Sequence, residues 1–230
     1  MNVAIITGGS LGLGRATADD LVHHGWHVVI DGRDADALRA AADRMGAAVT
    51  AVPGDVSDSW HRLALVEAAA ARGRLDLVVN NASTLGPTPM PPLCDLTPGA
   101  LEDVMRVNVV APLGLMQAAL PLLAASSGAV VNVTSDAAAE PYEGWGGYGA
   151  SKAALEQLSN IFATEEPEVR VWSFDPGDMR TRMHQDAFPG EDISDRPPPE
   201  EVAPAVRRLV TDRPPSGRVR AAELLTEART

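Results

Sequence analysis

Cysteine is almost absent from this 230-residue chain, in which Cys94 is the only one. A single cysteine cannot form an internal disulfide, so a disulfide-stabilised framework is excluded. We expect Cys94 to be a buried or loop thiol and not a nucleophile. The sequence also lacks a His/Cys cluster with metal-ligand spacing, and we therefore predict no metal site.

Basic residues are also scarce, with 19 Lys and Arg against 31 Asp and Glu and a formal net charge of -12. Phosphate backbones and anionic lipids would repel such a protein, so neither nucleic acid nor a membrane is expected as its main partner. The start, "MNVAIITGG", has no basic region and no long apolar region, so we expect no signal peptide. No apolar run looks long enough to span a bilayer. We predict a cytoplasmic protein.

Short apolar runs alternate with longer amphipathic segments, and 45% of the residues are hydrophobic. We expect strands at 3–7, 27–31, 48–53, 76–81, 129–134 and 169–174, and helices at 13–24, 34–45, 58–73, 98–125 and 149–165. This alternation predicts an α/β fold, a Rossmann-like doubly wound parallel sheet with helices on both faces. The length suits a single domain over 1–230.

Two Pro-rich stretches, 85–99 and 188–204, each follow the end of a predicted strand. Open parallel sheets bind ligands at the carboxyl ends of their strands. Either stretch could be a solvated linker, but this position favours a loop that covers a ligand. We expect a substrate lid around 178–204.

The stretch "TGGSLGLG" (7–14) lies where the first strand gives way to the first helix. Its spacing, G-x-x-x-G-x-G, differs from the usual dinucleotide fingerprint. The physical effect is the same, because glycines allow a tight turn and let backbone N–H groups approach a pyrophosphate. A glycine turn without a ligand is the alternative. The position at the start of a parallel-sheet pattern favours a cofactor.

The second strand, in "HVVIDGRD" (27–34), ends where such folds select the adenosine ribose. Gly32 occupies the predicted selector position and Arg33 follows it. A guanidinium binds phosphate through forked, charge-assisted hydrogen bonds, which favours NADP(H). If the register is shifted by one residue, Asp31 becomes the selector and NAD(H) the cofactor.

The stretch "YGASK" (148–152) places Tyr148 and Lys152 at i and i+4, on one face of a helix. An ammonium near a phenol favours the phenolate and so lowers the tyrosine pKa. This pairing is useful if Tyr148 must exchange a proton. Taken alone, the match also fits a helix start with a surface lysine.

Together, "TGGSLGLG", "NNAS" (80–83), Asn108, Ser135, "YGASK" and "PGDMRT" (176–181) resemble a classical short-chain dehydrogenase/reductase. They occur in that family's order and at nearly its spacings, over essentially the whole chain. The resemblance implies an oxidoreductase of ketoreductase type that transfers a hydride between NADP(H), or NAD(H), and a carbonyl or secondary alcohol.

The resemblance also implies a catalytic set. Tyr148 would be the general acid in reduction and the base in oxidation, and its pKa would have to fall. Lys152 would lower that pKa and bind the nicotinamide ribose. Ser135 would hydrogen-bond the substrate carbonyl. Asn108 would hold a water that links Lys152 to solvent.

Further residues would bind the cofactor by the same resemblance. They comprise the phosphate turn, the phosphate-binding arginine, the adenosine site, the catalytic pair and the nicotinamide loop: Gly8, Ser10, Gly12, Leu13, Gly14, Arg33, Asp55, Val56, Asn81, Ala82, Tyr148, Lys152, Pro176, Gly177, Met179 and Thr181. Thr181 would bond the carboxamide.

The chain departs from the family pattern at two places. Ser83 replaces the common glycine of the "NNAG" motif, and we expect little loss of cofactor binding. A seventh strand near 217–222 would carry Arg218 and Arg220 where apolar residues are usual, which leaves its pairing open. We expect a homodimer or homotetramer, with a dimer built from the helices near 98–125 and 149–165.

Aromatic and sulfur-containing residues near the catalytic set could border the substrate or merely pack the loops: Tyr142, Trp145, Met183, His184 and Phe188. Both interpretations stay open, and the substrate is limited to a carbonyl or alcohol of modest size. Two other functions compete. A non-catalytic NADP(H)-binding sensor or regulatory module would not need the catalytic set. An epimerase or dehydratase relative would usually have a longer C-terminal region.

Overall fold

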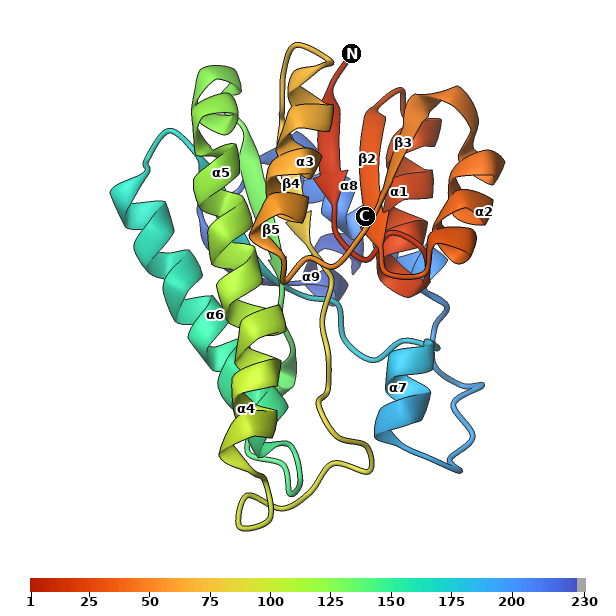
Figure 1. Cartoon of the computed structure of the whole chain (residues 1–230), viewed down its shortest axis with the longest axis vertical. Coiled ribbons are helices and arrows are strands. Elements are labelled where there is room, and N and C mark those ends of the chain that lie inside the picture. Colours follow the sequence, from red (N-terminus) through yellow and green to blue (C-terminus); the bar gives the residue numbers. More distant parts are fainter. Residues whose placement is uncertain (227–230) are drawn as a thin grey trace.

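The computed structural model describes residues 1–226 and contains a seven-stranded parallel sheet with helices on both faces (Figure 1). The strand order is β3-β2-β1-β4-β5-β6-β7, so the order reverses between β1 and β4. The strands are β1 Val3–Ile6, β2 His27–Gly32, β3 Val49–Pro53, β4 Leu77–Asn80, β5 Ala129–Val133, β6 Arg170–Asp175 and β7 Gly217–Arg220. The predicted doubly wound fold is confirmed.

Two helical layers cover the sheet, because alternate strand residues point to opposite faces. Ala4 and Ile6 of β1 join one apolar core, whereas Val3 and Ile5 join the other. The first core is covered by α1 Gly12–His23, α2 Ala35–Met45, α8 Pro199–Asp212 and α9 Ala221–Thr226. The second is covered by α3 Ser59–Ala70, α5 Ala111–Ser126 and α6 Gly146–Glu165. α7 Arg182–Ala187 lies beyond the sheet, near the site (Figure 1).

Helix starts follow from local side chains. The Asp34 carboxylate accepts hydrogen bonds from the backbone N–H groups of Asp36 and Ala37 and so caps α2. Thr97 caps α4 Pro98–Met105, and Pro98 begins that helix without needing an N–H partner. The starts of these two helices agree with the predicted ranges, which begin at 34 and 98.

The helical stretch Pro98–Ser126 is less uniform than predicted. It comprises α4, a π-helical turn over Arg106–Val110 and then α5. The stretch has 29 residues, and its most apolar 18-residue segment has a mean hydropathy of 1.7, so by length and composition it could cross a membrane, contrary to the sequence expectation. The helix packs on the sheet through Leu115, Ala119 and Leu123, which are buried in the second core. Most of its most apolar segment nevertheless lies outside the core of this chain.

The C-terminal part differs most from expectation. β7 does form and pairs with β6 in parallel, with Ser173 opposite Arg218. The sequence did not indicate α7, α8 or α9. The expected lid boundary at 204 is wrong, because α8 begins at Pro199 and buries Val202 and Ala203 against the first core. Cys94 is exposed in the loop that leads to α4.

Candidate active site

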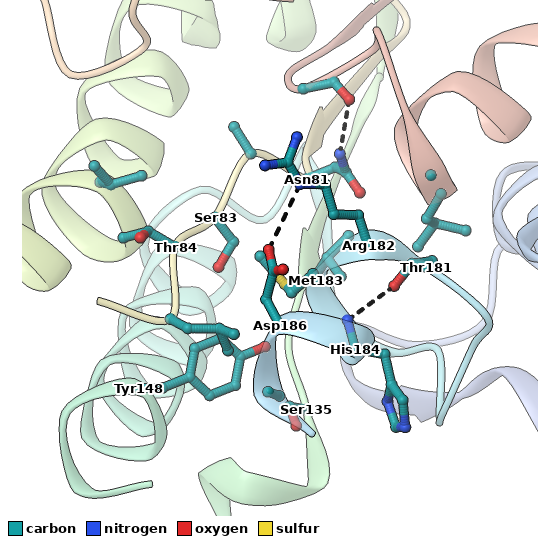
Figure 2. Close-up of a pocket in the computed structure, with 18 of the residues that line it drawn as sticks. Asn81, Ser83, Thr84, Ser135, Tyr148, Thr181, Arg182, Met183, His184 and Asp186 are labelled. Carbon is teal, nitrogen blue, oxygen red and sulfur yellow. Dashed lines mark hydrogen bonds and ion pairs between the residues drawn. The ribbon is translucent and has the colours of Figure 1, made fainter. Parts of the chain in front are cut away.

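A cavity of about 860 Å³ opens at the carboxyl ends of the strands, between the glycine turn, the β4 and β5 loops and α7 (Figure 2). Its volume falls in the range of ligand pockets, about 300–1,000 Å³. Every residue predicted for the site lines it except Gly14 and Asn108. The strand order reverses here, which is where doubly wound folds bind their ligands.

The glycine turn has the backbone that a dinucleotide cradle needs. Gly8 and Gly12 have φ angles of +67° and +54°, a region that side chains disfavour. Asn81 holds the turn, since its Nδ2 donates to the Thr7 carbonyl at 2.8 Å. Gly14 serves packing, because a Cβ there would lie 2.4 Å from the Gly8 carbonyl oxygen. The close approach of α1 to the turn therefore depends on it.

Asp31 is buried at the edge of the cavity, and both of its carboxylate oxygens have partners within the protein. Its carboxylate accepts from the Gly8 N–H at 2.6 Å and lies 3.0 Å from His61 Nε2. A side chain used in this way is poorly placed to bind a ribose, which argues against Asp31 as the selector. Sequence reasoning missed this role, because His61 approaches only in the folded chain.

Gly32 and Arg33 take the position that the sequence predicted. A Cβ at Gly32 would lie 3.1 Å from Ser10 Oγ, so the missing side chain keeps space at the end of β2. Arg33 is exposed and lines the cavity. Burial alone would raise the pKa of the Asp55 carboxyl, but hydrogen bonds from Ser57 and the charge of Arg33 bring that pKa below its usual value. Asp55 is therefore a carboxylate at neutral pH.

Tyr148 and Lys152 project from the first turns of α6. Both are buried, and Lys152 Nζ lies 5.4 Å from the centroid of the Tyr148 ring. Lys152 Nζ donates to the Val133 carbonyl at 2.8 Å. An ammonium has three N–H donors, so others remain for a ligand. Lys152 is also the only lysine in the chain.

Burial acts on both members of this pair. Desolvation lowers the pKa of Lys152 to about 8. Burial also raises the pKa of the Tyr148 phenol well above its usual value; a hydrogen bond with Ser135 opposes this rise, and the charges of Asp136 and Asp175 add to it. The fall in the tyrosine pKa that the resemblance implies is thus not a property of the protein alone.

Ser135 lies in the loop after β5, on the cavity wall. Its hydroxyl donates to the Asp136 carboxylate at 2.8 Å. Burial would raise the pKa of Asp136, but hydrogen bonds from Ser135 and Tyr142 hold it below its usual value. Asp136 is therefore a charged acceptor that competes with any substrate for the Ser135 proton.

Asn108 lies behind the cavity and not in its wall. Its Nδ2 donates to the Thr84 carbonyl and to Ser151 Oγ, each at 2.9 Å, and its Oδ1 accepts from the Thr84 N–H and the Ser83 hydroxyl. The side chain is therefore fully used. Pro112 lacks the N–H that an α-helix would direct at the Asn108 carbonyl, which frees that oxygen from its regular bond.

The substrate side of the cavity is lined by α6 and α7. Trp145, Met183 and His184 line it, whereas Tyr142 and Phe188 pack on Trp145 with ring centroids 6.1 and 5.7 Å away. Trp145, Met183 and His184 are thus placed to border a substrate, whereas Tyr142 and Phe188 pack the loops.

Sequence reasoning missed two charged residues of α7 that also line the cavity. Arg182 and Asp186 project into it, with Arg182 Nε 3.7 Å from Asp186 Oδ2 (Figure 2). Their i,i+4 spacing was a usable signal, but α7 itself was not predicted.

These features define a dinucleotide-binding α/β protein with a tyrosine–lysine pair at the cofactor cavity. Residues 2–192 match the short chain dehydrogenase family. The chain is 33% identical over 224 residues to an uncharacterized oxidoreductase, YciK, of Escherichia coli, covering 91% of this chain and 86% of that protein. It is 30% identical over 230 residues to the sepiapterin reductase of Xenopus laevis, covering 94% and 84% of the two chains.

A solved structure gives the same result. The short chain dehydrogenase of Shigella flexneri complexed with NADP superposes with a TM-score of 0.89 at 31% identity, covering 96% of this chain and 97% of that one. The chain belongs to the short-chain dehydrogenase/reductase family. The resemblance read from the sequence is confirmed.

Proposed function

We propose that this protein is an NADP(H)-dependent oxidoreductase of ketoreductase type that interconverts a carbonyl compound and a secondary alcohol. The observation that carries this proposal is the single cavity lined by the glycine turn, Ser135, Tyr148 and Lys152. The cofactor would supply a hydride to the carbonyl carbon when bound. The test is NADPH consumption with a panel of ketones and aldehydes, and no turnover with any of them would contradict the proposal.

In reduction, the Tyr148 hydroxyl would donate its proton to the carbonyl oxygen. The Lys152 ammonium would stabilise the phenolate that forms, because an opposite charge nearby favours the charged state. Ser135 would exchange Asp136 for the substrate oxygen and donate to it as negative charge develops there. In oxidation the same groups act in reverse, with Tyr148 as the base.

The proton that leaves Tyr148 must be replaced. We assign the water-holding role to the main-chain carbonyl of Asn108, because its side chain is committed to Thr84 and Ser151. A water on that carbonyl would link Lys152 to solvent. The asparagine side chain would act by fixing the π-helical turn that presents the carbonyl.

Arg33 would select NADP(H) by binding the 2′-phosphate. We expect Arg33→Gln to weaken NADPH binding by about 10-fold or more, since hydrogen bonds to charged groups contribute about 1.5–3 kcal/mol. NADH binding should stay unchanged. Nicotinamide fluorescence titration measures both affinities. Arg39→Gln is the control, because Arg39 is exposed on α2 and pairs with Asp36. Equal loss of NADPH and NADH binding would contradict this role for Arg33.

The apolar outer side of Pro98–Ser126, with α6, would form a homodimer. Val110 and Ile161 are 54% and 43% exposed there, large values for apolar side chains. Sedimentation should show a dimer, and Val110→Glu should convert it to a monomer. Leu93→Glu, on an exposed loop, should leave the dimer intact. A monomeric wild-type protein would contradict this proposal.

The cytoplasmic location expected from the sequence stays a prediction, as do the metal-free mechanism and the absence of nucleic-acid and membrane partners. Within residues 1–226, His, Cys, Asp and Glu form no group that could hold a metal ion.

A further inference from the structure

Arg218 lies on β7, a strand whose arginines have no place in the mechanism above. Its guanidinium reaches behind the active site and not into it. One nitrogen, Nη2, donates to the Asp175 carboxylate at 2.8 Å and to the Ser135 carbonyl at 3.2 Å. The other, Nη1, pairs with the Glu156 carboxylate.

Each partner of Arg218 belongs to a different element of the active site. Ser135 is the residue proposed to bind the substrate oxygen. Asp175 ends β6, and its other oxygen accepts from the Gly177 N–H at 3.0 Å, which fixes the turn on the nicotinamide side. Glu156 is one helical turn beyond Lys152 on α6, and it accepts from the Thr134 hydroxyl at 2.6 Å. The planar fork of one arginine thus connects β5, β6 and α6.

Two of the three partners of Arg218 are carboxylates that are shielded from water. The side chains of Asp175 and Glu156 are only 7% and 19% exposed, and the Arg218 side chain is 26% exposed. Asp175, with Asp136, is one of the carboxylates whose charge disfavours the Tyr148 phenolate. A positive charge at this place therefore offsets the negative charge behind the tyrosine.

We propose that Arg218 is a positioning residue, which holds Ser135 and the nicotinamide-side turn in register with α6 and compensates the carboxylates behind Tyr148. It touches neither substrate nor cofactor and acts through Ser135, Asp175 and Glu156. The predicted effect on catalysis rests on the proposed function. The predicted effect on the charges around Tyr148 and Lys152 does not require turnover.

The first test compares Arg218→Met with Arg220→Met. Arg220 is on the same strand, is exposed, and its side chain makes no hydrogen bond or ion pair among residues 1–226. We expect Arg218→Met to lower kcat by about 10–100-fold, as small misplacements of reacting groups do. The acidic limb of the alcohol-oxidation pH profile, on which activity rises as the base Tyr148 loses its proton, should move to higher pH, because Asp175 and Glu156 lose their counter-ion. Arg220→Met should match the wild type.

Arg218→Lys separates geometry from charge. A lysine keeps the positive charge but cannot fork to several acceptors. We expect its kcat to fall while its pH profile stays near that of the wild type. If Arg218→Met does not fold, the fall in kcat of Arg218→Lys still tests the positioning role. Equal kcat and equal pH profiles in Arg218→Met, Arg218→Lys and the wild type would overturn the proposal, as would equal losses in Arg218→Met and Arg220→Met.

A second readout does not depend on turnover. Because Lys152 is the only lysine, ¹³C-lysine labelling gives one lysine side-chain signal, whose pH titration reports the Lys152 pKa. Tyr148 lies against this lysine, with its ring centroid 5.4 Å from Lys152 Nζ. Asp136 and Asp175 are the carboxylates that act on Tyr148, and Arg218 pairs with Asp175 and Glu156. Loss of Arg218 leaves the carboxylates uncompensated, so the Lys152 pKa should rise above about 8 in Arg218→Met and stay in Arg220→Met. An unchanged pKa in Arg218→Met would overturn the electrostatic role even if no carbonyl substrate is turned over.

Discussion

Tyr148→Phe should lower kcat for carbonyl reduction by about 1,000-fold, within the range of general acid–base catalysis. The change removes one oxygen from a buried ring, and the hydroxyl is the only group that we propose to donate a proton to the substrate. The cavity keeps its shape, so NADPH binding should change little. Steady-state kinetics and nicotinamide fluorescence measure the two quantities separately.

The chain offers a matched control for this variant, because Tyr142 is its only other tyrosine. Tyr142 is 46% exposed and donates to Asp136 at 2.9 Å, outside the reacting position. Tyr142→Phe should keep kcat within about 5-fold, because exposed interactions with a charged group contribute about 1 kcal/mol or less. If Tyr148→Phe stayed as active as Tyr142→Phe, Tyr148 would not be the acid. If Tyr148→Phe kept a regulatory response to NADPH, this result would favour the non-catalytic sensor over the enzyme.

Lys152→Met should combine a large loss of activity with a gain in stability. Without the ammonium, the phenolate loses its nearest positive charge, and we expect kcat to fall by about 100-fold or more. The folded-state pKa of Lys152 is about 8 against a usual 10.5, so the unfolded chain binds the proton more tightly. Burying the charged form therefore costs up to about 3 kcal/mol at pH 7, which the methionine avoids.

The stability difference between Lys152→Met and the wild type should depend on pH, because Lys152 titrates at a lower pH in the folded chain than in the unfolded chain. As pH rises from about 8 to about 10.5, the unfolded wild-type chain holds more protons than the folded one, so the wild type gains stability. The advantage of Lys152→Met should shrink over that range. Denaturant unfolding at matched pH measures it, with the exposed Gln157→Met on α6 as control. A less stable Lys152→Met at pH 7 would contradict the proposed cost.

The sequence was most informative where local chemistry decides structure. Strands such as β1 are short runs of Val and Ile buried on both faces, and Asp34 and Thr97 cap the helices that follow them. The cofactor cavity was predictable because its residues follow strand ends, which meet at one edge of a parallel sheet. For the same reason the predicted site residues converge, apart from Gly14 and Asn108.

The remaining features depend on contacts between distant parts of the chain. Asp31 looked like a possible ribose selector, but His61 and the glycine turn bury it. The proline-rich segment before α8 suggested a longer lid, because proline at the first turn of a helix is easily mistaken for a loop. From the sequence, Arg218 looked like an obstacle to strand pairing, because an arginine stands where apolar residues are usual. Its carboxylate partners, Glu156 of α6 and Asp175 of β6, are brought to it only by the fold.

The most direct test of the proposed function is the fate of a deuterium label. The protein would be incubated with a mixture of ketones and aldehydes and with NADPH that carries deuterium on the transferable face of the nicotinamide ring. Mass spectrometry should then find an alcohol with deuterium on the former carbonyl carbon, formed by the wild type and nearly absent with Tyr148→Phe. Bound NADPH with no deuterium in any alcohol would contradict hydride transfer to a carbonyl as the activity of this protein.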